Sequence, residues 1–249
     1  MRINQGQMKM KRNLYVRETV STNELLWALV KEQPVPEGFY VHAGYQWGGK
    51  GQAGNSWESE RGKNLLFSMV FYPGFLPPDE LFFISQLVSV GIKKTLDEYT
   101  GNITIKWPND IYFEDKKLGG ILIENSLQGT RIKAVVAGIG LNVNQNEFVS
   151  DAPNPVSLRQ ITGRRVERSA LLRKIIRNIL DLYANEPVER IRSLYGGSLF
   201  RRVGYFRYRD DNGDFMAKIN AIQPDGQLEL ETTSGEIKLF YFKEVSCVF

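Results

Sequence analysis

The sequence contains very little of the two residue types that most often bind metals or act as activated nucleophiles. Among 249 residues there is one cysteine, Cys247, and one histidine, His42. A single cysteine excludes an internal disulfide framework. One cysteine and one histidine are also too few to form the His and Cys ligand set of a zinc site. A Ser/His/Asp or Cys/His system could be built only around His42, which lies in the alternating stretch 39–45 and is expected to be an ordinary strand residue.

Long apolar runs and a strong charge of one sign are also missing. No run approaches the about 20 apolar residues that span a bilayer, and Met1 to Arg12 lacks the apolar middle of a signal peptide. The 32 basic and 28 acidic residues give a net charge of +4, which is too small and too mixed to indicate nucleic acid by itself. With 42% hydrophobic residues the chain can form a core, so we expect a soluble, cytoplasmic protein with no membrane contact.

Hydrophobic periodicity indicates the secondary structure of a large first domain. Ser21 followed by Glu24 matches a capping box and predicts a helix to about Lys31. Apolar spacing predicts two further helices, and the second is expected to close this domain. The predicted helices cover 79–99 and 167–184, and the predicted strands cover 39–46, 65–72, 103–107, 117–124 and 132–141.

The pattern changes after about Phe200. Short alternating runs at 203–209, 215–222, 227–231 and 236–242 are separated by turn signals such as Asp211-Asn212-Gly213, which is typical of antiparallel strands. We therefore predict an α+β protein with two domains: a mixed β-sheet flanked by helices over 1–195, and a small β-barrel over 196–249.

Three segments carry residues suited to binding small anionic molecules. Gln46 to Trp57 combines four glycines, a lysine and tryptophans, so its backbone N–H groups could approach a phosphate or carboxylate, although a plain hairpin loop would look the same. Lys106 to Asp110 and Lys116 to Glu124 place lysines near a turn and two glycines, which also fits a solvated charged hairpin. The segment Ala137 to Asn144 ends an apolar strand and contains alternate glycines and two asparagines. This pattern fits the floor of a pocket, and it equally fits a buried strand that packs closely on a helix.

Taken in order, these segments resemble biotin protein ligase. The matching motifs are Ser-Thr-Asn, Gln with a Gly-rich loop ending in Trp, Lys-Trp-Pro-Asn-Asp, Lys-Leu-Gly-Gly-Ile-Leu and Gly-Ile-Gly-Leu-Asn-Val-Asn. The resemblance covers essentially the whole chain and includes the family's SH3-like C-terminal module. It implies the biotin/lipoate ligase-like fold and an enzyme that activates biotin with ATP and Mg²⁺, then attaches it to a lysine of a biotin carboxyl carrier protein.

The resemblance also implies a set of site residues. Lys117 and Lys50 are the implied catalytic residues, with Lys117 holding the biotin carboxylate and the α-phosphate. Asp110 is a candidate magnesium ligand. The implied biotin-binding residues are Ser21, Thr22, Asn23, Gln46, Gly49, Lys50, Gly51, Lys117, Gly120, Gly138 and Gly140. The implied nucleotide-binding residues are Gln52, Asn55, Trp57, Lys106, Asn109, Asp110 and Asn142, with Trp57 stacking on adenine and Asn142 reading the base.

The Gly-rich loop departs from the family pattern. Trp47, Lys50, Gln52 and Asn55 stand where typical members have a threonine and three arginines, so two positive charges and the bidentate guanidinium groups are lost. We expect weaker retention of the triphosphate and of biotinyl-5′-AMP, unless Arg61 or Lys63 supplies charge.

Two alternative functions and two further expectations remain. A lipoyl or octanoyl ligase or transferase has a related fold, but an acyl chain would leave the polar partners at Gln46 unpaired. A nucleic-acid-binding module would use the arginines alternating with aromatics over 200–209. Only twenty residues precede Ser21, so we expect a monofunctional ligase without the helix-turn-helix domain of the repressor members, with no DNA binding, as a monomer or homodimer.

Overall fold

The computed structural model describes residues 12–149 and 154–248. Of the N-terminal segment Met1 to Arg12, only Arg12 lies in the described part. Seven strands form a mixed sheet in the order β1-β2-β3-β7-β6-β5-β4, in which β1 is parallel to β2 and the other neighbours are antiparallel. The strands are β1 (Asn13–Val16), β2 (Tyr40–Ala43), β3 (Leu65–Phe71), β4 (Ile103–Lys106), β5 (Asp110–Phe113), β6 (Lys116–Gln128) and β7 (Arg131–Leu141).

Strand β3 is buried along its whole length because both faces of the sheet are covered. Phe67, Met69 and Phe71 point into the larger core, and Val70 points into a smaller core beneath α1 (Thr22–Glu32). Such a continuous apolar run is what a strand buried on both faces requires. Ser68 interrupts the run on the α1 side, and it lies beside the cavity described below.

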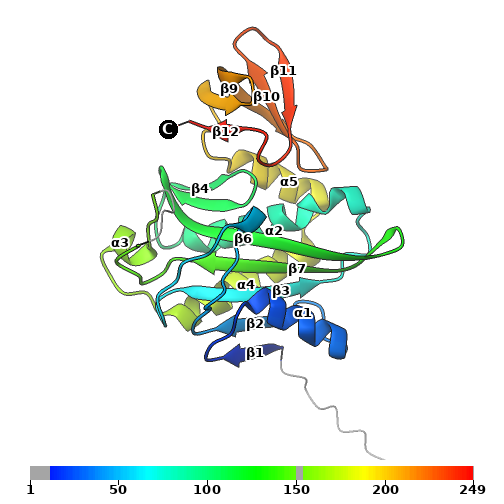
Figure 1. Ribbon diagram of the computed structural model, residues 1–249, viewed down its shortest axis with the longest axis vertical. Coiled ribbons are helices and arrows are strands. Elements are labelled where there is room, and N and C mark those ends of the chain that lie inside the picture. The colour runs from blue at the N-terminus through cyan, green and yellow to red at the C-terminus, as the bar shows by residue number, and fades with distance from the viewer. Residues whose placement is uncertain (1–11, 150–153, 249) are drawn as a thin grey trace, which may run out of the picture.

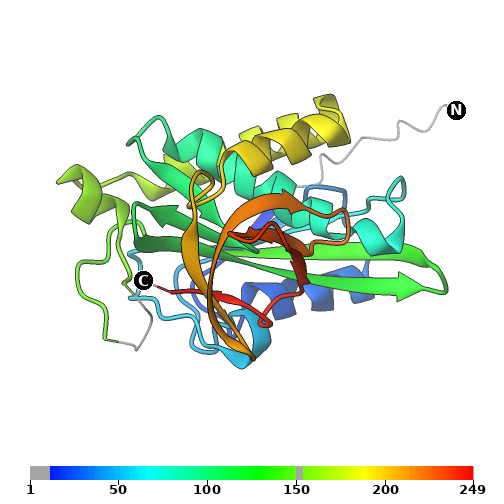
Figure 2. The same ribbon diagram turned by 90° about the horizontal axis from the view of Figure 1, so that it is seen from above.

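Helices cover the two faces unequally. Helix α1 packs on β2, β3 and β7, whereas α2 (Phe82–Leu96) packs on the opposite face and is itself covered by α4 (Arg168–Asn185) and α5 (Val188–Gly197). Figure 1 shows this arrangement, and Figure 2 shows α1 and α5 on opposite sides of the large sheet. The short elements are η1 (Gln52–Gly54), η2 (Pro78–Glu80) and α3 (Leu158–Thr162). Within the described residues no helix is long and apolar enough to cross a membrane.

A second sheet follows α5 and lies beyond β4 and α5 in Figure 1. Its strands are β8 (Phe206–Asp210), β9 (Gly213–Ile222), β10 (Leu228–Thr232), β11 (Ile237–Phe240) and β12 (Ser246–Cys247), in the order β11-β10-β9-β8-β12. This antiparallel sheet is consistent with an SH3-like module. The predicted small β-barrel is not closed, because the outer strands β11 and β12 do not pair with each other.

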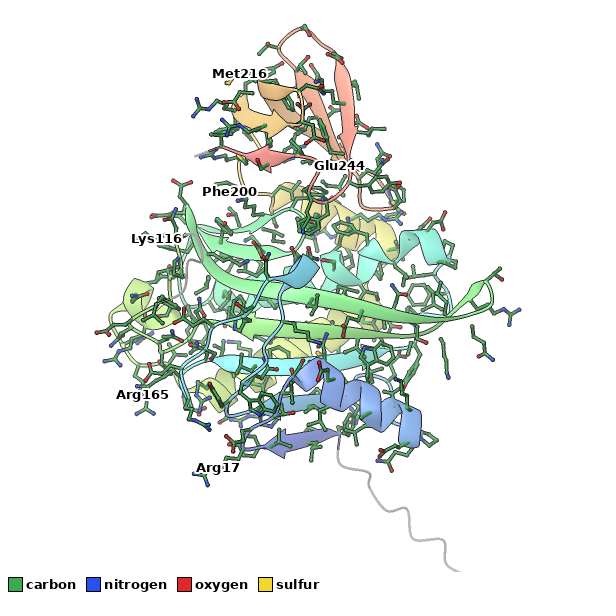
Figure 3. All side chains as sticks on the ribbon, in the orientation of Figure 1. Arg17, Lys116, Arg165, Phe200, Met216 and Glu244 are labelled. Carbon is green, nitrogen blue, oxygen red and sulfur yellow. The ribbon has the colours of Figure 1, made fainter. Side chains whose placement is uncertain are left out.

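The junction between the two sheets is made by named contacts. Trp107 donates its indole N–H to the Gly226 carbonyl at 2.9 Å. Gly226 has φ +95°, and a Cβ there would lie 2.7 Å from the ring of Phe82, so only glycine lets the β9–β10 turn approach α2 this closely. Ile105 and Leu199 form a parallel bridge that continues the contact. Phe200, labelled in Figure 3, lies at this junction.

The predicted elements of the first domain are confirmed, apart from some boundaries and omissions. The capping box at Ser21 is wrong: Ser21 is the N-cap of α1 but makes no side-chain cap hydrogen bond, since Glu24 pairs with Lys50 instead. The single helix over 79–99 is divided into η2 and α2. Helix α4 does not close the domain, because α5 follows it. The sequence interpretation missed β1, β5, α3, α5 and β12, most of which are too short to show a period.

Candidate active site

A cavity of about 590 Å³ lies between the large sheet and the C-terminal sheet. Its walls come from the start of α1, the loop between β2 and β3, the β4–β5 turn, strands β6 and β7, and the C-terminal sheet. The structure brings nearly all of the predicted site residues to this one place. Those that line it are Ser21, Thr22, Asn23, Gln46, Lys50, Gly51, Gln52, Asn55, Trp57, Lys106, Asn109, Asp110, Lys117, Gly120, Gly138 and Gly140.

Gly49 and Asn142 do not line the cavity. A Cβ on Gly49 would lie 2.9 Å from the Trp57 carbonyl and 3.2 Å from Gln46 Nε2, so this glycine lets the loop fold closely. Asn142 is buried, and its backbone N–H donates to the Leu118 carbonyl at 2.9 Å.

The floor of the cavity depends on glycines in β6 and β7. A Cβ on Gly138 would lie 2.1 Å from Asn23 Oδ1, and one on Gly140 would lie 2.3 Å from the indole of Trp57. These two positions leave room for polar and aromatic side chains that reach over the sheet, which explains glycine in an otherwise apolar strand. Gly120 on β6 is similarly close to Trp57 and Asp110, each 3.3 Å from its Cβ position.

One end of the cavity is polar and is made by residues that precede or begin α1 together with Gln46. We call Ser21, Thr22, Asn23 and Gln46 the polar end. The first three are 4% exposed. Gln46 Oε1 accepts a hydrogen bond from the backbone N–H of Thr22 at 2.6 Å, which ties the loop after β2 to the helix. The polar end therefore lines the cavity with polar side chains, which suits a polar ligand.

Lysines and one carboxylate form the opposite, cationic end. Lys117 Nζ lies 2.8 Å from Asp110 Oδ1, with side chains 25% and 22% exposed. Lys117 also lies 5.9 Å from the centroid of the Trp57 ring. Burial lowers the pKa of the Lys106 ammonium, although the nearby Asp110 carboxylate opposes this. An anionic ligand would compensate the desolvated positive charge here.

The β4–β5 turn that carries Asp110 is held from below. The Trp107–Pro108 peptide bond is cis, and the Pro108 carbonyl accepts from Tyr195 Oη at 3.0 Å and from Ser85 Oγ at 3.3 Å. The Asn109 carboxamide donates to the Ile121 carbonyl. Asn109 is therefore bound to β6, and Asp110 begins β5.

Five buried side-chain polar atoms have no hydrogen-bond partner within the described part of the chain. Three of them belong to predicted site residues, namely Trp57 Nε1, Gln52 Oε1 and Asn142 Oδ1, and the other two are Thr104 Oγ1 and Arg192 Nε. An unpaired buried polar atom costs about 1–3 kcal/mol, so such atoms in a native protein require an explanation. Trp57 and Gln52 line the cavity, where a ligand could supply the missing partner.

The charges of the Gly-rich loop and of the residues shortly after it are paired with carboxylates. Lys50 forms a 2.5 Å ion pair with Glu24, which raises the pKa of its ammonium. Arg61 pairs with Glu18 at 2.6 Å, and Lys63 pairs with Glu60 at 3.4 Å. Neither Arg61 nor Lys63 lines the cavity, so the structure gives no support to their compensating for the missing arginines.

Sequence reasoning missed the contribution of the C-terminal sheet. Arginines that suggested a nucleic-acid surface have internal partners: Arg207 and Arg209 pair with Asp214, and Arg201 donates to Cys247 Sγ at 3.0 Å. Of the aromatic residues between them, Tyr208 is buried, whereas Tyr205 is 41% exposed. The cavity residues that were missed on this side are Phe200, Tyr208, Ile219, Leu228, Phe242, Lys243, Val245, Ser246 and Cys247.

No cluster of three or more His, Cys, Asp or Glu side chains that could hold a metal occurs among residues 12–149 and 154–248. Asp110 is a single carboxylate. Mg²⁺ commonly binds one or two carboxylates together with substrate phosphates, and Asp110 fits that mode.

Residues 15–142 match the sequence model of the Biotin/lipoate A/B protein ligase family, about half of the chain, and the chain belongs to this family. The bifunctional ligase/repressor BirA of Bacillus subtilis is 29% identical over 241 residues, covering 93% of this chain and 73% of the relative. The biotin--[acetyl-CoA-carboxylase] ligase of Paracoccus denitrificans is 31% identical over 139 residues, 53% of this chain and 58% of the relative.

Solved structures show the same relationship. The biotin protein ligase from Aquifex aeolicus in complex with biotin and ATP has a TM-score of 0.74 and 27% identity, over 96% of this chain and 99% of the other. The mixed sheet with its helices and the C-terminal sheet is thus the fold of biotin protein ligases.

Proposed function

We infer that the chain is a biotin protein ligase, which activates biotin with ATP and transfers it to a lysine of a carboxyl carrier protein. Relatives named as biotin ligases and a similar structure that contains biotin and ATP support this function. The observation that carries it is one cavity with a polar end suited to a ureido ring and a cationic end suited to carboxylate and phosphate.

In the first half-reaction, a biotin carboxylate oxygen attacks the α-phosphorus of ATP, and the bond to the bridging oxygen breaks, so diphosphate leaves. Both reactants are anions. Lys117, with Lys106 nearby, reduces their repulsion and stabilises the negative charge that accumulates at phosphorus. Mg²⁺ bound to the phosphates would neutralise further charge, and Asp110 is the residue we propose to hold it.

In the second half-reaction, the amine of the carrier lysine attacks the acyl carbon of biotinyl-5′-AMP. The carbon–oxygen bond to AMP breaks, an amide forms, and the amine loses its proton. No covalent bond to the enzyme is needed. Holding the two reactants together gives an advantage that reaches about 7–11 kcal/mol in favourable intramolecular reactions.

We propose roles for the remaining residues. Ser21, Thr22 and Gln46 bind the ureido ring, Gly138 and Gly140 let biotin lie on the sheet, and Trp57 stacks on adenine. Asn142 reads the base only if the loop around Trp57 rearranges, since its buried amide lies off the cavity. The proposed division into 1–195 and 196–249 gives the second domain a share of the cavity wall.

A pyrophosphate-exchange assay tests this function. Biotin should promote exchange of labelled diphosphate into ATP, while lipoate and octanoate should not. Incubation with labelled biotin, Mg-ATP and an extract of the source cell should then label a carrier protein. Exchange with lipoate but not with biotin would contradict the proposed function.

A further inference from the structure

Ser68 is fully buried on β3, between two oxygen atoms at the polar end. Its Oγ lies 2.7 Å from Thr22 Oγ1 and 2.6 Å from Asn23 Oδ1. A serine hydroxyl carries a single hydrogen, so Ser68 can donate to only one of these oxygens. The other contact must be a hydrogen bond that Ser68 accepts.

Glu124 decides which oxygen receives that hydrogen. On β6, Glu124 Oε2 accepts from Asn23 Nδ2 at 2.8 Å and from Trp27 Nε1 at 3.2 Å. A carboxylate oxygen only accepts, so the nitrogen of the Asn23 carboxamide faces Glu124 and its oxygen faces Ser68. Gly138 leaves space for this orientation, because a Cβ there would lie 2.1 Å from Asn23 Oδ1.

The direction of the remaining hydrogen bonds follows. Asn23 Oδ1 has no hydrogen, so Ser68 donates to it and must accept the hydroxyl hydrogen of Thr22. Thr22 lines the cavity, and with its hydroxyl hydrogen directed at Ser68 its Oγ1 can offer a ligand only lone pairs. Gln46 Oε1 is already bound to the Thr22 N–H, so the free group of Gln46 is its Nε2 donor.

We propose that Glu124 is a positioning residue that acts through Asn23 and Ser68 to make Thr22 Oγ1 an acceptor. This acceptor lies beside the Nε2 donor of Gln46, whose orientation the Thr22 N–H fixes. A ureido ring offers an N–H donor next to a carbonyl acceptor, which complements this pair. A dithiolane ring or a plain acyl chain offers no N–H group and would leave Thr22 unpaired. This inference rests on the proposed function and deepens it by assigning the basis of selection against lipoate and octanoate.

A charge effect is the competing explanation. The Glu24 carboxylate, and to a smaller extent that of Glu124, raises the pKa of Lys50. Removing Glu124 therefore also changes the electrostatics of the loop. Glutamine separates the two explanations. Glu124→Gln loses the charge but keeps an oxygen that accepts from Asn23 and Trp27, whereas Glu124→Leu loses both.

The experiment measures dissociation constants by calorimetry for wild type, Glu124→Gln and Glu124→Leu. The ligands are biotin and the two biotin analogues in which one or the other ureido nitrogen is methylated. Glu37→Leu is the matched control, because Glu37 Oε1 also accepts two hydrogen bonds, from the Tyr72 N–H and from Tyr183 Oη, away from the cavity. Circular dichroism verifies that each variant is folded.

Wild type should bind biotin at least about tenfold more tightly than one of the methylated analogues, which corresponds to about one hydrogen bond. Glu124→Leu should bind biotin about tenfold more weakly and lose this discrimination, while Glu124→Gln and Glu37→Leu keep both within about threefold. Equal losses of biotin affinity for Glu124→Gln and Glu124→Leu would overturn this inference but not the proposed function. The same holds if Glu124→Leu binds biotin more weakly but still discriminates against the methylated analogue. Failure of wild type to bind biotin while it binds lipoate would overturn the proposed function as well.

Discussion

Lys117 and Asp110 form an ion pair in the absence of ligand, and both side chains are mostly buried. Such a pair is poised for a reaction between anions, because the ammonium can leave the carboxylate for an incoming phosphate. Removal of one partner leaves the other as an uncompensated buried charge, which is more costly than removal of both.

We therefore expect Lys117→Met to slow formation of biotinyl-5′-AMP by about 100-fold or more, the effect typical of losing one group that stabilises transition-state charge. Methionine keeps the aliphatic stem and the packing. The measurement is the single-turnover rate at saturating biotin and ATP. In thermal unfolding, Lys117→Met with Asp110→Asn should be more stable than Lys117→Met alone, since no uncompensated buried carboxylate remains. A near-normal rate for Lys117→Met would remove this side chain from the mechanism.

Single residues also show the limit of reading a sequence. The pattern Ser21 with Glu24 predicts a capping box that does not form, whereas Ser157 and Gln160 form a real one at α3. Both have the required spacing, but Glu24 is attracted by Lys50, which is distant in sequence. Ser68 and Glu124 were not found for the same reason: a serine in an apolar strand and an acid near a strand end acquire meaning only from their neighbours.

At the scale of elements, length determined what could be predicted. Strands β3 and β7 and helices α2 and α4 are long enough for their apolar period to be evident, and they were predicted. Strand β5 has four residues directly after the Trp107–Pro108–Asn109 turn, and its pairing with β4 and β6, rather than its own sequence, defines it. The ordered motifs identified nearly every residue that lines the cavity from the first domain, but nothing indicated the C-terminal residues.

The loop that contains η1 is the element in which the sequence pattern predicts a departure from the family. Gln52 Oε1 is buried without a partner in the described part of the chain, and Lys50 is bound to Glu24. If this loop closes over biotinyl-5′-AMP, we expect it to hold the intermediate with fewer charge-assisted hydrogen bonds than three arginines would provide.

We expect Gln52→Arg to slow the release of biotinyl-5′-AMP by about tenfold, because one charge-assisted hydrogen bond contributes about 1.5–3 kcal/mol. The dissociation rate of the intermediate is measured at low and moderate salt, and the difference should shrink at higher ionic strength. Gln128→Arg at the exposed end of β6 makes the same change in net charge outside the cavity and serves as control. Identical release rates at both salt concentrations would show that loop charge does not control retention.

For the molecule as a whole, the two sheets act together because each supplies part of one cavity. The Trp107 indole connects them. Its N–H donates to the Gly226 carbonyl of the C-terminal sheet, and Trp107 itself lies in the β4–β5 turn that leads to Asp110. The Trp107 ring also lies 6.4 Å from that of Phe242, in an edge-to-face arrangement. The position of the C-terminal sheet is therefore coupled to the turn at the cationic end.

Trp107→Phe should lower the melting temperature by about 2–4 °C, as expected for loss of one hydrogen bond of about 1 kcal/mol in a protein of this size. It should also raise KM for ATP more than KM for biotin, because the cationic end is the part that the C-terminal sheet encloses. Thermal unfolding and initial rates provide the two readings. Trp47→Phe is the control, since Trp47 is 65% exposed. Equal changes in both KM values would argue against this coupling.

The order of strands in the large sheet has a consequence for biosynthesis. Strand β3 lies between β2 and β7, so after Phe71 leaves the ribosome one edge of this strand, which is buried along its whole length in the finished fold, has no partner until Arg131–Leu141 has also been made. During that interval the growing chain presents an open strand edge and much of its future core, which are the features that promote aggregation and recruit chaperones. The sheet that forms the cavity floor is thus completed late. Expression at a lower temperature, or together with added chaperones, should increase the yield of correctly folded protein.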